Sequence, residues 1–123
     1  MLKGDEKINN AYRQANEKGH IFIIPAAAYY EIRRGLIAVN ATAQIAAFYK
    51  LCNSFDVEEM TIDSWEKAAR IWATLRERGT PIGKGDGDIL IAAQCIVNGY
   101  TVITDNVSDF SRIDGIEIIN WKD

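Results

Sequence analysis

The chain has 123 residues, of which 48% are hydrophobic and 25% charged, and a formal net charge of −3. This length fits one domain and allows burial of roughly two-thirds of the surface that the unfolded chain exposes. The acidic balance argues against binding to nucleic acid through bulk charge, so any such contact needs a local basic patch. No apolar run approaches the roughly 20 residues that span a bilayer, and the N-terminal residues do not resemble a signal peptide. We therefore expect a cytoplasmic protein that does not contact a membrane.

The first half of the chain predicts two helices in a hairpin after a buried strand. Residues 5–18 have apolar positions at helical spacing, and the β-branched run at 20–24 ends at Pro25, as a buried parallel strand would. The residues after Pro25 regain helical spacing, with a break near Asn40. The expected helices of the hairpin are 26–37 and 41–52.

The second half continues the alternation of strands and helices. A weak edge strand at 57–62 precedes a helix at 65–78, with Asp63 as its N-cap and Gly79 at its C-terminal end. The expected buried stripe of this helix is Ala68, Ala69, Trp72 and Leu75. After a loop at 80–87, the remaining expected elements are a helix at 88–97 and strands at 100–104 and 116–121. This order predicts an α/β domain with a parallel sheet and helices on both faces.

Four oxygen-bearing side chains follow strands or begin helices in this scheme. Asp86 and Asp88 stand before the helix at 88–97, Asn106 follows the strand at 100–104, and Glu31 lies on the helix after the first strand. Functional groups of open α/β sheets gather beyond the carboxyl ends of the strands, so these side chains are expected to converge. Hard oxygen ligands without histidine or thiol point to Mg²⁺ or Mn²⁺, and thus to metal-assisted phosphodiester hydrolysis.

Each of these residues also has an ordinary structural interpretation. Asp88 fits a helix N-cap, Asp86 a solvent-facing loop residue, and Glu31 an exposed ion pair with Arg34. Asp109 fits the cap of a helical turn that begins at Phe110. Taken singly these interpretations are the commoner ones, whereas the combination favours a site. Cys52 and Cys95 lack partners at metal-ligand spacing, so two buried thiols are expected.

Four segments resemble the PIN-domain ribonucleases of the VapC toxin type. They are YYEIRRGL at 29–36, RGTPIGKGDGDILIAA at 78–93, TVITDNVSDF at 101–110 and GIEIINW at 115–121. The resemblance runs over nearly the whole chain, so we expect one PIN-like domain over residues 1–123. It implies a three-layer α/β sandwich with a mostly parallel central sheet, which cleaves RNA with Mg²⁺ or Mn²⁺.

The resemblance also assigns roles to individual residues. Glu31, Asp86 and Asp88 match metal-binding acids of the family, and Asn106 matches the next residue of the metal shell, with Thr104 and Asp109 in support. The local cations that could contact an RNA backbone are Arg33, Arg34 and Lys84. The family further implies a cognate antitoxin that covers the acidic pocket, and a homodimer.

One departure from the family pattern concerns its first strand. Family members begin with a strand that ends in an aspartate, a central metal ligand, whereas Met1 here stands after the position of both. We expect the first strand to be missing, and metal binding and nuclease activity to be weakened. The alternative is a non-catalytic PIN-like module that binds or regulates a partner protein. A receiver-like acidic pocket fits less well, because its paired acids and its lysine are absent from the expected positions.

Overall fold

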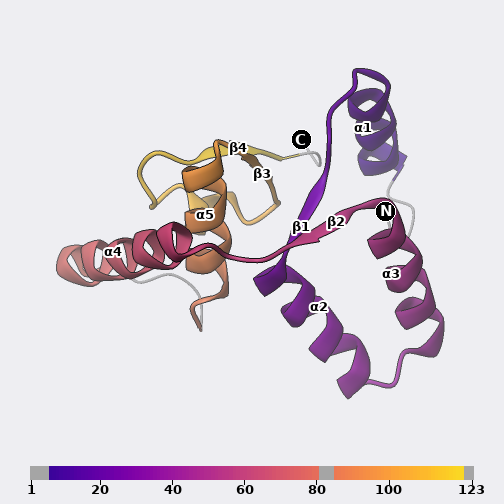
Figure 1. Cartoon of the computed structure of the whole chain (residues 1–123), viewed down its shortest axis with the longest axis horizontal. Coiled ribbons are helices and arrows are strands. Elements are labelled where there is room, and N and C mark those ends of the chain that lie inside the picture. The colour runs from indigo at the N-terminus through magenta and orange to yellow at the C-terminus, as the bar shows by residue number, and fades with distance from the viewer. Residues whose placement is uncertain (1–5, 81–84, 121–123) are drawn as a thin grey trace. The chain divides into compact units, whose positions relative to one another are not determined.

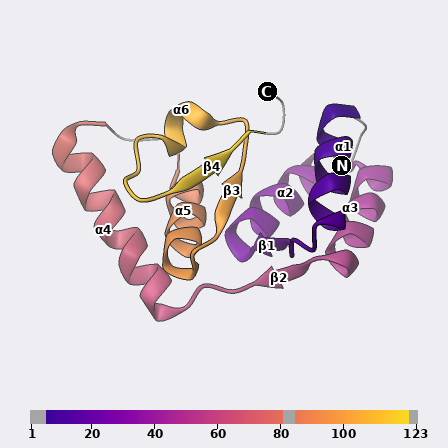
Figure 2. The same ribbon diagram turned by 90° about the horizontal axis from the view of Figure 1, so that it is seen from above.

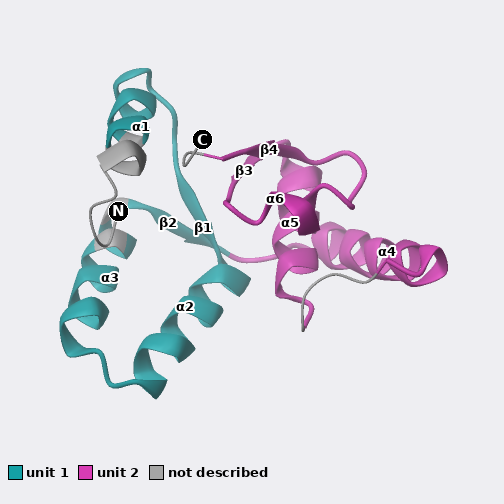
Figure 3. Cartoon of the chain, turned by 180° about the vertical axis from the view of Figure 1, so that it is seen from behind, with its two compact units in different colours: residues 1–58, 122 teal, residues 59–121, 123 magenta. Residues whose placement is uncertain are grey.

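The computed structural model describes residues 6–80 and 85–120, and the chain divides into two compact units, one ending at Glu58 and the other beginning at Glu59 (Figure 3). Unit 1 contains helices α1, α2 and α3 and strands β1 and β2 (Figure 1). Unit 2 contains helices α4, α5 and α6 and strands β3 and β4 (Figure 2). The strands within residues 6–80 and 85–120 pair in parallel, so the α/β class with parallel strands is confirmed.

Unit 1 is built around a short parallel strand pair. Its elements are α1 (Glu6–Glu17), β1 (Ile23–Pro25), α2 (Ala26–Ala38), α3 (Thr42–Ser54) and β2 (Asp56–Glu58). In the register, Ile24 of β1 lies opposite Val57 of β2. Ile24, Phe48 and Phe55 are buried, and the Phe22 ring stacks on that of Phe55 with 5.5 Å between the ring centroids. The predicted helices match α1, α2 and α3 within two residues.

The predicted strand at 20–24 is shifted and shorter in the structure. It begins only at Ile23 and includes Pro25, and the Ile21 side chain is 88% exposed. The three paired residues of β2 set this length, since a strand extends only as far as its hydrogen-bonding partner. The local sequence contains no information about where that partner ends.

Of the buried clusters formed by described residues, the larger lies in unit 2. The elements of this unit are α4 (Ile62–Arg78), α5 (Gly87–Asn98), β3 (Thr101–Ile103), α6 (Val107–Phe110) and β4 (Glu117–Ile119). Strand β3 pairs in parallel with β4, with Val102 opposite Ile118. Helices α4 and α5 pack closely, and their buried side chains join those of Val102, Phe110 and Ile113 in one cluster. The described strands thus form two parallel pairs, one in each unit.

The predictions of where α4 starts and of which of its faces is buried were both wrong in part. Thr61, and not Asp63, is the N-cap, and its Oγ1 accepts a hydrogen bond from the Ser64 amide at 3.2 Å. The buried positions include Ile71 and Leu75, whereas Trp72 is 46% exposed and lies under the Arg76 guanidinium. The predicted stripe is therefore rotated by about one residue. Ala68 and Leu75 are buried as predicted, and Ala69 is exposed.

Helix α5 is the element that carries the predicted acidic stretch. It begins at Gly87 and ends at Asn98, and its C-cap Gly99 has a φ of 72°, in the left-handed conformation that glycine adopts readily. Its buried residues include Ala92 and Ala93, both fully inaccessible, which lets a neighbouring helix approach closely. Cys95 is buried and Cys52 half-buried, and neither forms a disulfide. Across 6–80 and 85–120, the helices are too short or too polar to cross a bilayer.

Candidate active site

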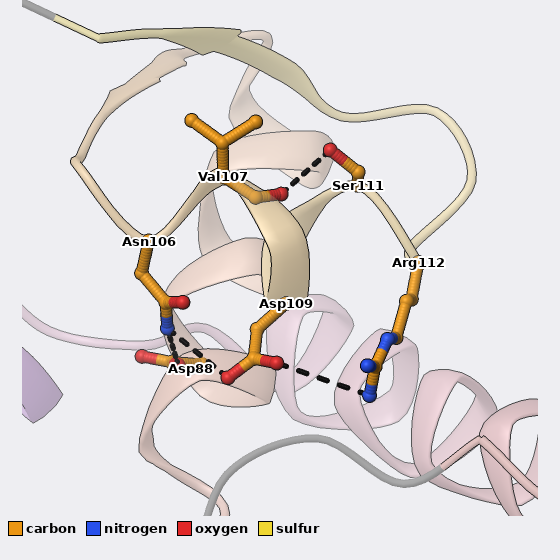
Figure 4. A network of polar contacts seen from close by, with 6 residues as sticks. All are labelled: Asp88, Asn106, Val107, Asp109, Ser111 and Arg112. Atoms are coloured by element: carbon orange, nitrogen blue, oxygen red, sulfur yellow. Dashed lines mark hydrogen bonds and ion pairs between the residues drawn. The ribbon is translucent and has the colours of Figure 1, made fainter.

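Two carboxylates of unit 2 are bridged by one amide. Asn106 Nδ2 donates a hydrogen bond to Asp88 Oδ2 at 3.0 Å and another to Asp109 Oδ2 at 3.2 Å (Figure 4). Because an ionised carboxylate only accepts hydrogen bonds, the amide nitrogen is the end of the side chain that suits both partners. Asp88, Asn106 and Asp109 are all half-buried. We call these three residues the acidic cluster.

The local structure of unit 2 explains why these residues meet. Asp88 lies in the first turn of α5, and Asn106 stands directly before α6. The backbone N–H of Asn106 donates to Thr104 Oγ1 at 3.0 Å, and the backbone N–H of Thr104 donates to the Ile119 carbonyl at 3.0 Å. These bonds tie the loop after β3 to β4 and fix the direction in which Asn106 leaves the strand. The Thr104 hydroxyl therefore supports the cluster by holding the backbone of Asn106 in place.

Helix α6 presents Asp109 to the cluster. The helix has only four residues, and its Phe110 side chain is 3% exposed, so burial of this ring anchors the turn. Asp109 is an interior residue of this turn, so its predicted role as a cap before Phe110 is wrong. Its Oδ1 lies 3.8 Å from Arg112 Nη1 (Figure 4). Sequence reasoning missed Arg112, although its i,i+3 spacing from Asp109 is typical of a helical ion pair.

Burial raises the pKa of the Asp88 carboxyl above its usual value of 3.8. The nearby charge of Asp109 raises this pKa further, and the hydrogen bond from Asn106 opposes the shift. The cluster thus holds negative charge that its own hydrogen bonds compensate only in part. A bound cation would favour the ionised form of both carboxylates.

The oxygen donors of the cluster fit a hard divalent cation. Mg²⁺ is commonly bound through one or two carboxylates, with water and substrate phosphate at the remaining positions. Asp88 and Asp109 supply two carboxylates, and the Asn106 amide nitrogen lies within hydrogen-bond distance of both. Within residues 6–80 and 85–120, no three His, Cys, Asp or Glu side chains come together as a metal-binding group. The donor set therefore suits a cation that keeps several of its waters.

The other predicted acids are outside this hydrogen-bonded cluster. Asp86 is the N-cap residue of α5, its side chain is exposed, and it makes no capping hydrogen bond. The interpretation of Asp88 as the N-cap is accordingly wrong, since that position belongs to Asp86. Glu31 is half-buried on α2 in unit 1. Its participation with the unit 2 residues stays a prediction.

The three predicted RNA-contacting cations are differently placed. The Arg33 guanidinium lies over the Tyr49 ring at 4.6 Å from its centroid, and that of Arg34 lies over Tyr30 at 5.0 Å. Arg33 Nη1 is buried and has no hydrogen-bond partner within the described ranges. Both arginines belong to α2 of unit 1, and Lys84 lies outside the described residues.

Comparison with known proteins identifies the family. A model of the PIN domain matches residues 1–116. The chain therefore belongs to the PIN-domain family, as its sequence motifs predict.

Two relatives with names that state an activity are similar in sequence. Ribonuclease VapC1 of Rickettsia felis is 36% identical over 81 residues, which are 65% of this chain and 59% of the relative. The tRNA(fMet)-specific endonuclease VapC of Salmonella typhimurium is 40% identical over 52 residues, which are 42% of this chain and 38% of the relative. The matched part is thus less than two thirds of the length of either relative.

Solved structures share the fold. VapBC2 of Rickettsia felis, bound to a DNA fragment from its promoter, aligns with 96% of this chain and 86% of its own, with a TM-score of 0.82 and 21% identity. DNA-bound VapBC of Salmonella typhimurium aligns with 94% of this chain and 85% of its own, with a TM-score of 0.82 and 24% identity. At this level of identity the likeness establishes the PIN-domain fold.

Proposed function

We propose that the chain is the toxin of a VapBC-type toxin–antitoxin pair and acts as a metal-dependent endoribonuclease. The observation that carries the proposal is the acidic cluster, in which Asn106 joins two carboxylates at the mouth of α5. Membership of the PIN-domain family and similarity to a relative named a ribonuclease support it. The reaction is the hydrolysis of a phosphodiester bond of RNA.

The proposed cofactor is Mg²⁺ or Mn²⁺, held in unit 2 by Asp88 together with Asp86. Such a cation, when bound, supplies a nucleophilic water at neutral pH and neutralises charge that develops on the phosphate. Asn106 keeps the Asp88 carboxylate in a fixed orientation, which a metal ligand needs for a defined geometry. Asp109 shares the same amide and adds negative charge beside Asp88, and Thr104 fixes the backbone of Asn106.

The proposed macromolecular partners are RNA, a cognate antitoxin and a second copy of the chain. The solved structures with the same fold are VapBC assemblies, which supports an antitoxin partner. Arg33, Arg34 and Lys84 are proposed to contact the RNA backbone. We further propose a cytoplasmic location.

The replacement Asp88→Asn tests the proposed activity. We expect RNA cleavage in the presence of Mg²⁺ to fall roughly 100-fold or more, because several kcal/mol of transition-state stabilisation depend on the metal. Asp63→Asn is the matched control, since Asp63 occupies the first turn of α4 as Asp88 does that of α5, but is exposed. The control should cleave RNA at the rate of the unmodified chain.

Two results would contradict the proposal in different ways. Equal cleavage by the Asp88→Asn and Asp63→Asn variants would remove Asp88 from the site. A folded, unmodified chain that cleaves no RNA with either Mg²⁺ or Mn²⁺ would favour the non-catalytic binding module.

A further inference from the structure

A groove on unit 2 lies between α4 and the segment that follows α6. Its volume is about 120 Å³. Ile71, Leu75 and Ile113 are buried side chains that line it. The polar residues of the groove are Lys67, Arg70, Thr74, Arg78, Arg112 and Asp114. We call this feature the basic groove, because four of its nine lining residues are cations and one is an acid.

Helical spacing gathers the cations of α4 along the basic groove. Lys67, Arg70 and Arg78 follow one another at intervals of three and eight residues, which places them on one side of the helix. The Arg70 side chain is 73% exposed, and those of Arg78 and Arg112 are about half exposed. Each of the three arginines has an acidic partner, namely Glu66, Asp114 or Asp109, and cations outnumber acids among the residues that line the groove.

Two arginines at the basic groove form exposed ion pairs with carboxylates, and an anion that binds arginine more tightly can displace such a carboxylate. Arg78 Nη2 lies 2.7 Å from Asp114 Oδ2, and Arg70 Nη2 lies 3.0 Å from Glu66 Oε1. Exposed pairs of this type contribute little to stability, so exchanging the carboxylate for another anion costs little. A guanidinium presents two parallel donors that match phosphate oxygens, which makes phosphate an effective competitor.

The basic groove is connected to the acidic cluster through Arg112. This residue lines the groove and also pairs with Asp109, which accepts the hydrogen bond from Asn106 (Figure 4). A phosphodiester chain whose scissile phosphate lies at Asp88 would therefore meet Arg112 on leaving the cluster in this direction.

We propose that the basic groove binds backbone phosphate of the RNA substrate next to the point of cleavage. The proposal rests on the proposed ribonuclease function, and it adds a substrate-binding surface that differs from Arg33, Arg34 and Lys84. Arg70 and Lys67 contact phosphate, and Arg112 stands between the phosphate path and the acidic cluster. An acidic polypeptide would satisfy the same cations, but the link to the cluster favours RNA.

Binding of a single-stranded RNA oligonucleotide tests the basic groove. The full chain carries Asp88→Asn and is kept in EDTA so that the RNA stays intact, and the Kd is measured over a series of salt concentrations. We expect Arg70→Gln to weaken binding about three- to tenfold at low salt, and Lys67→Gln to act in the same direction. Each lost phosphate contact should reduce the slope of log K against log salt by about 0.7.

Arg76→Gln is the matched control for Arg70→Gln. Arg76 lies on the same helix, its loss changes the net charge equally, and its guanidinium covers Trp72 outside the basic groove. Its Kd and salt slope should equal those of the parent protein. Equal effects of the Arg70 and Arg76 replacements would overturn the proposal. The proposal would also be overturned if Arg70→Gln weakened the binding of poly-glutamate as much as it weakened the binding of RNA.

Cleavage by the chain with native Asp88 separates this proposal from the function on which it rests. If that chain cleaves RNA and Arg70→Gln leaves its KM unchanged, the groove proposal fails while the ribonuclease stands. If it cleaves no RNA but Arg70→Gln selectively weakens RNA binding, the ribonuclease fails while the phosphate-binding groove stands.

Discussion

Unit 1 and unit 2 both combine helices with a pair of parallel three-residue strands, but they bury apolar side chains to different extents. In the described part of unit 1 the buried hydrophobic cluster contains Ile24, Phe48 and Phe55. The corresponding cluster of unit 2 has ten buried members, drawn from α4, α5, β3, α6 and the segment after it. Among the described residues, three helices and two short parallel strands thus accompany buried clusters of very different size in the two units.

The two helices that carry predicted site residues, α2 with Glu31 and α5 with Asp88, differ in how much they bury. Helix α2, described along its whole length, has no buried residue, and its Tyr30 and Ile37 side chains are 60% and 55% exposed. Helix α5 buries five of its twelve residues. A side chain such as Asp88 gains a fixed direction from this burial, because the helix that carries it cannot rotate without exposing its apolar face. Burial in unit 2 thus fixes the orientation of the acidic cluster.

The largest expected effect comes from removing Phe48, the fully buried ring of unit 1. Phe48→Ala should lower the free energy of unfolding by about 3–5 kcal/mol, through lost burial and the cavity left behind. Hydrogen exchange should show amides of α2 and α3 losing protection while those of α5 keep it, if the units open separately. Tyr49→Ala is the control, since Tyr49 is the next residue in the chain and is 43% exposed. Equal loss of protection in α5 would instead support the predicted single domain.

A smaller effect is expected from Asn106→Ala, which removes the amide between the two carboxylates. RNA cleavage should fall roughly 10- to 100-fold, as is common when a residue that orients a metal ligand is lost. The exposed Asn53 of α3 provides the control, because Asn53→Ala removes the same side chain in unit 1. Cleavage by Asn106→Ala at the unmodified rate would show that Asp88 needs no orienting partner.

The smallest effect concerns the stability of the metal-free chain. Because the pKa of Asp88 is raised, the folded state holds this proton more tightly than the unfolded state. Ionisation of Asp88 therefore opposes folding as the pH rises above its usual pKa of 3.8, and below that value the penalty is absent.

Urea unfolding of the Asp88→Asn variant measures this penalty. Its midpoint should exceed that of the unmodified chain at pH 7, and the difference should vanish near pH 3, where both states of the unmodified chain are protonated. Asp63→Asn should give no gain at pH 7, because an exposed carboxylate in a first helical turn is favourable. A lower midpoint for Asp88→Asn at pH 7 would contradict the sign of the shift.

The meeting of Asp88 and Asn106 could be predicted from local patterns. The two residues are 18 positions apart, but one begins a helix and the other follows the strand after that helix. In an α/β unit the start of the helix and the end of the following strand lie at the same edge. The glycines that end α4 and α5 were also predictable, because their left-handed backbone favours this residue.

Other features depend on partners that are distant in sequence. Arg78 pairs with Asp114 across 36 positions, and no local period indicates such a pair. The exposure of Trp72 and the burial of Ile71 follow from where α5 packs, although both residues are apolar. The N-cap choice between Thr61 and Asp63 was open because both residue types cap helices. The place of Asp109 inside α6 depends on the burial of Phe110.

The reversal of the chain at Gly99 makes the length of α5 a condition for the acidic cluster. Twelve helical residues rise about 18 Å, and an extended path of about five residues covers nearly the same length in return. One residue inserted into α5 would turn Asp88 by about 100° around the helix axis relative to its buried face. Sequence change inside this helix is therefore expected as substitution, because an insertion or deletion there would turn Asp88 away from Asn106.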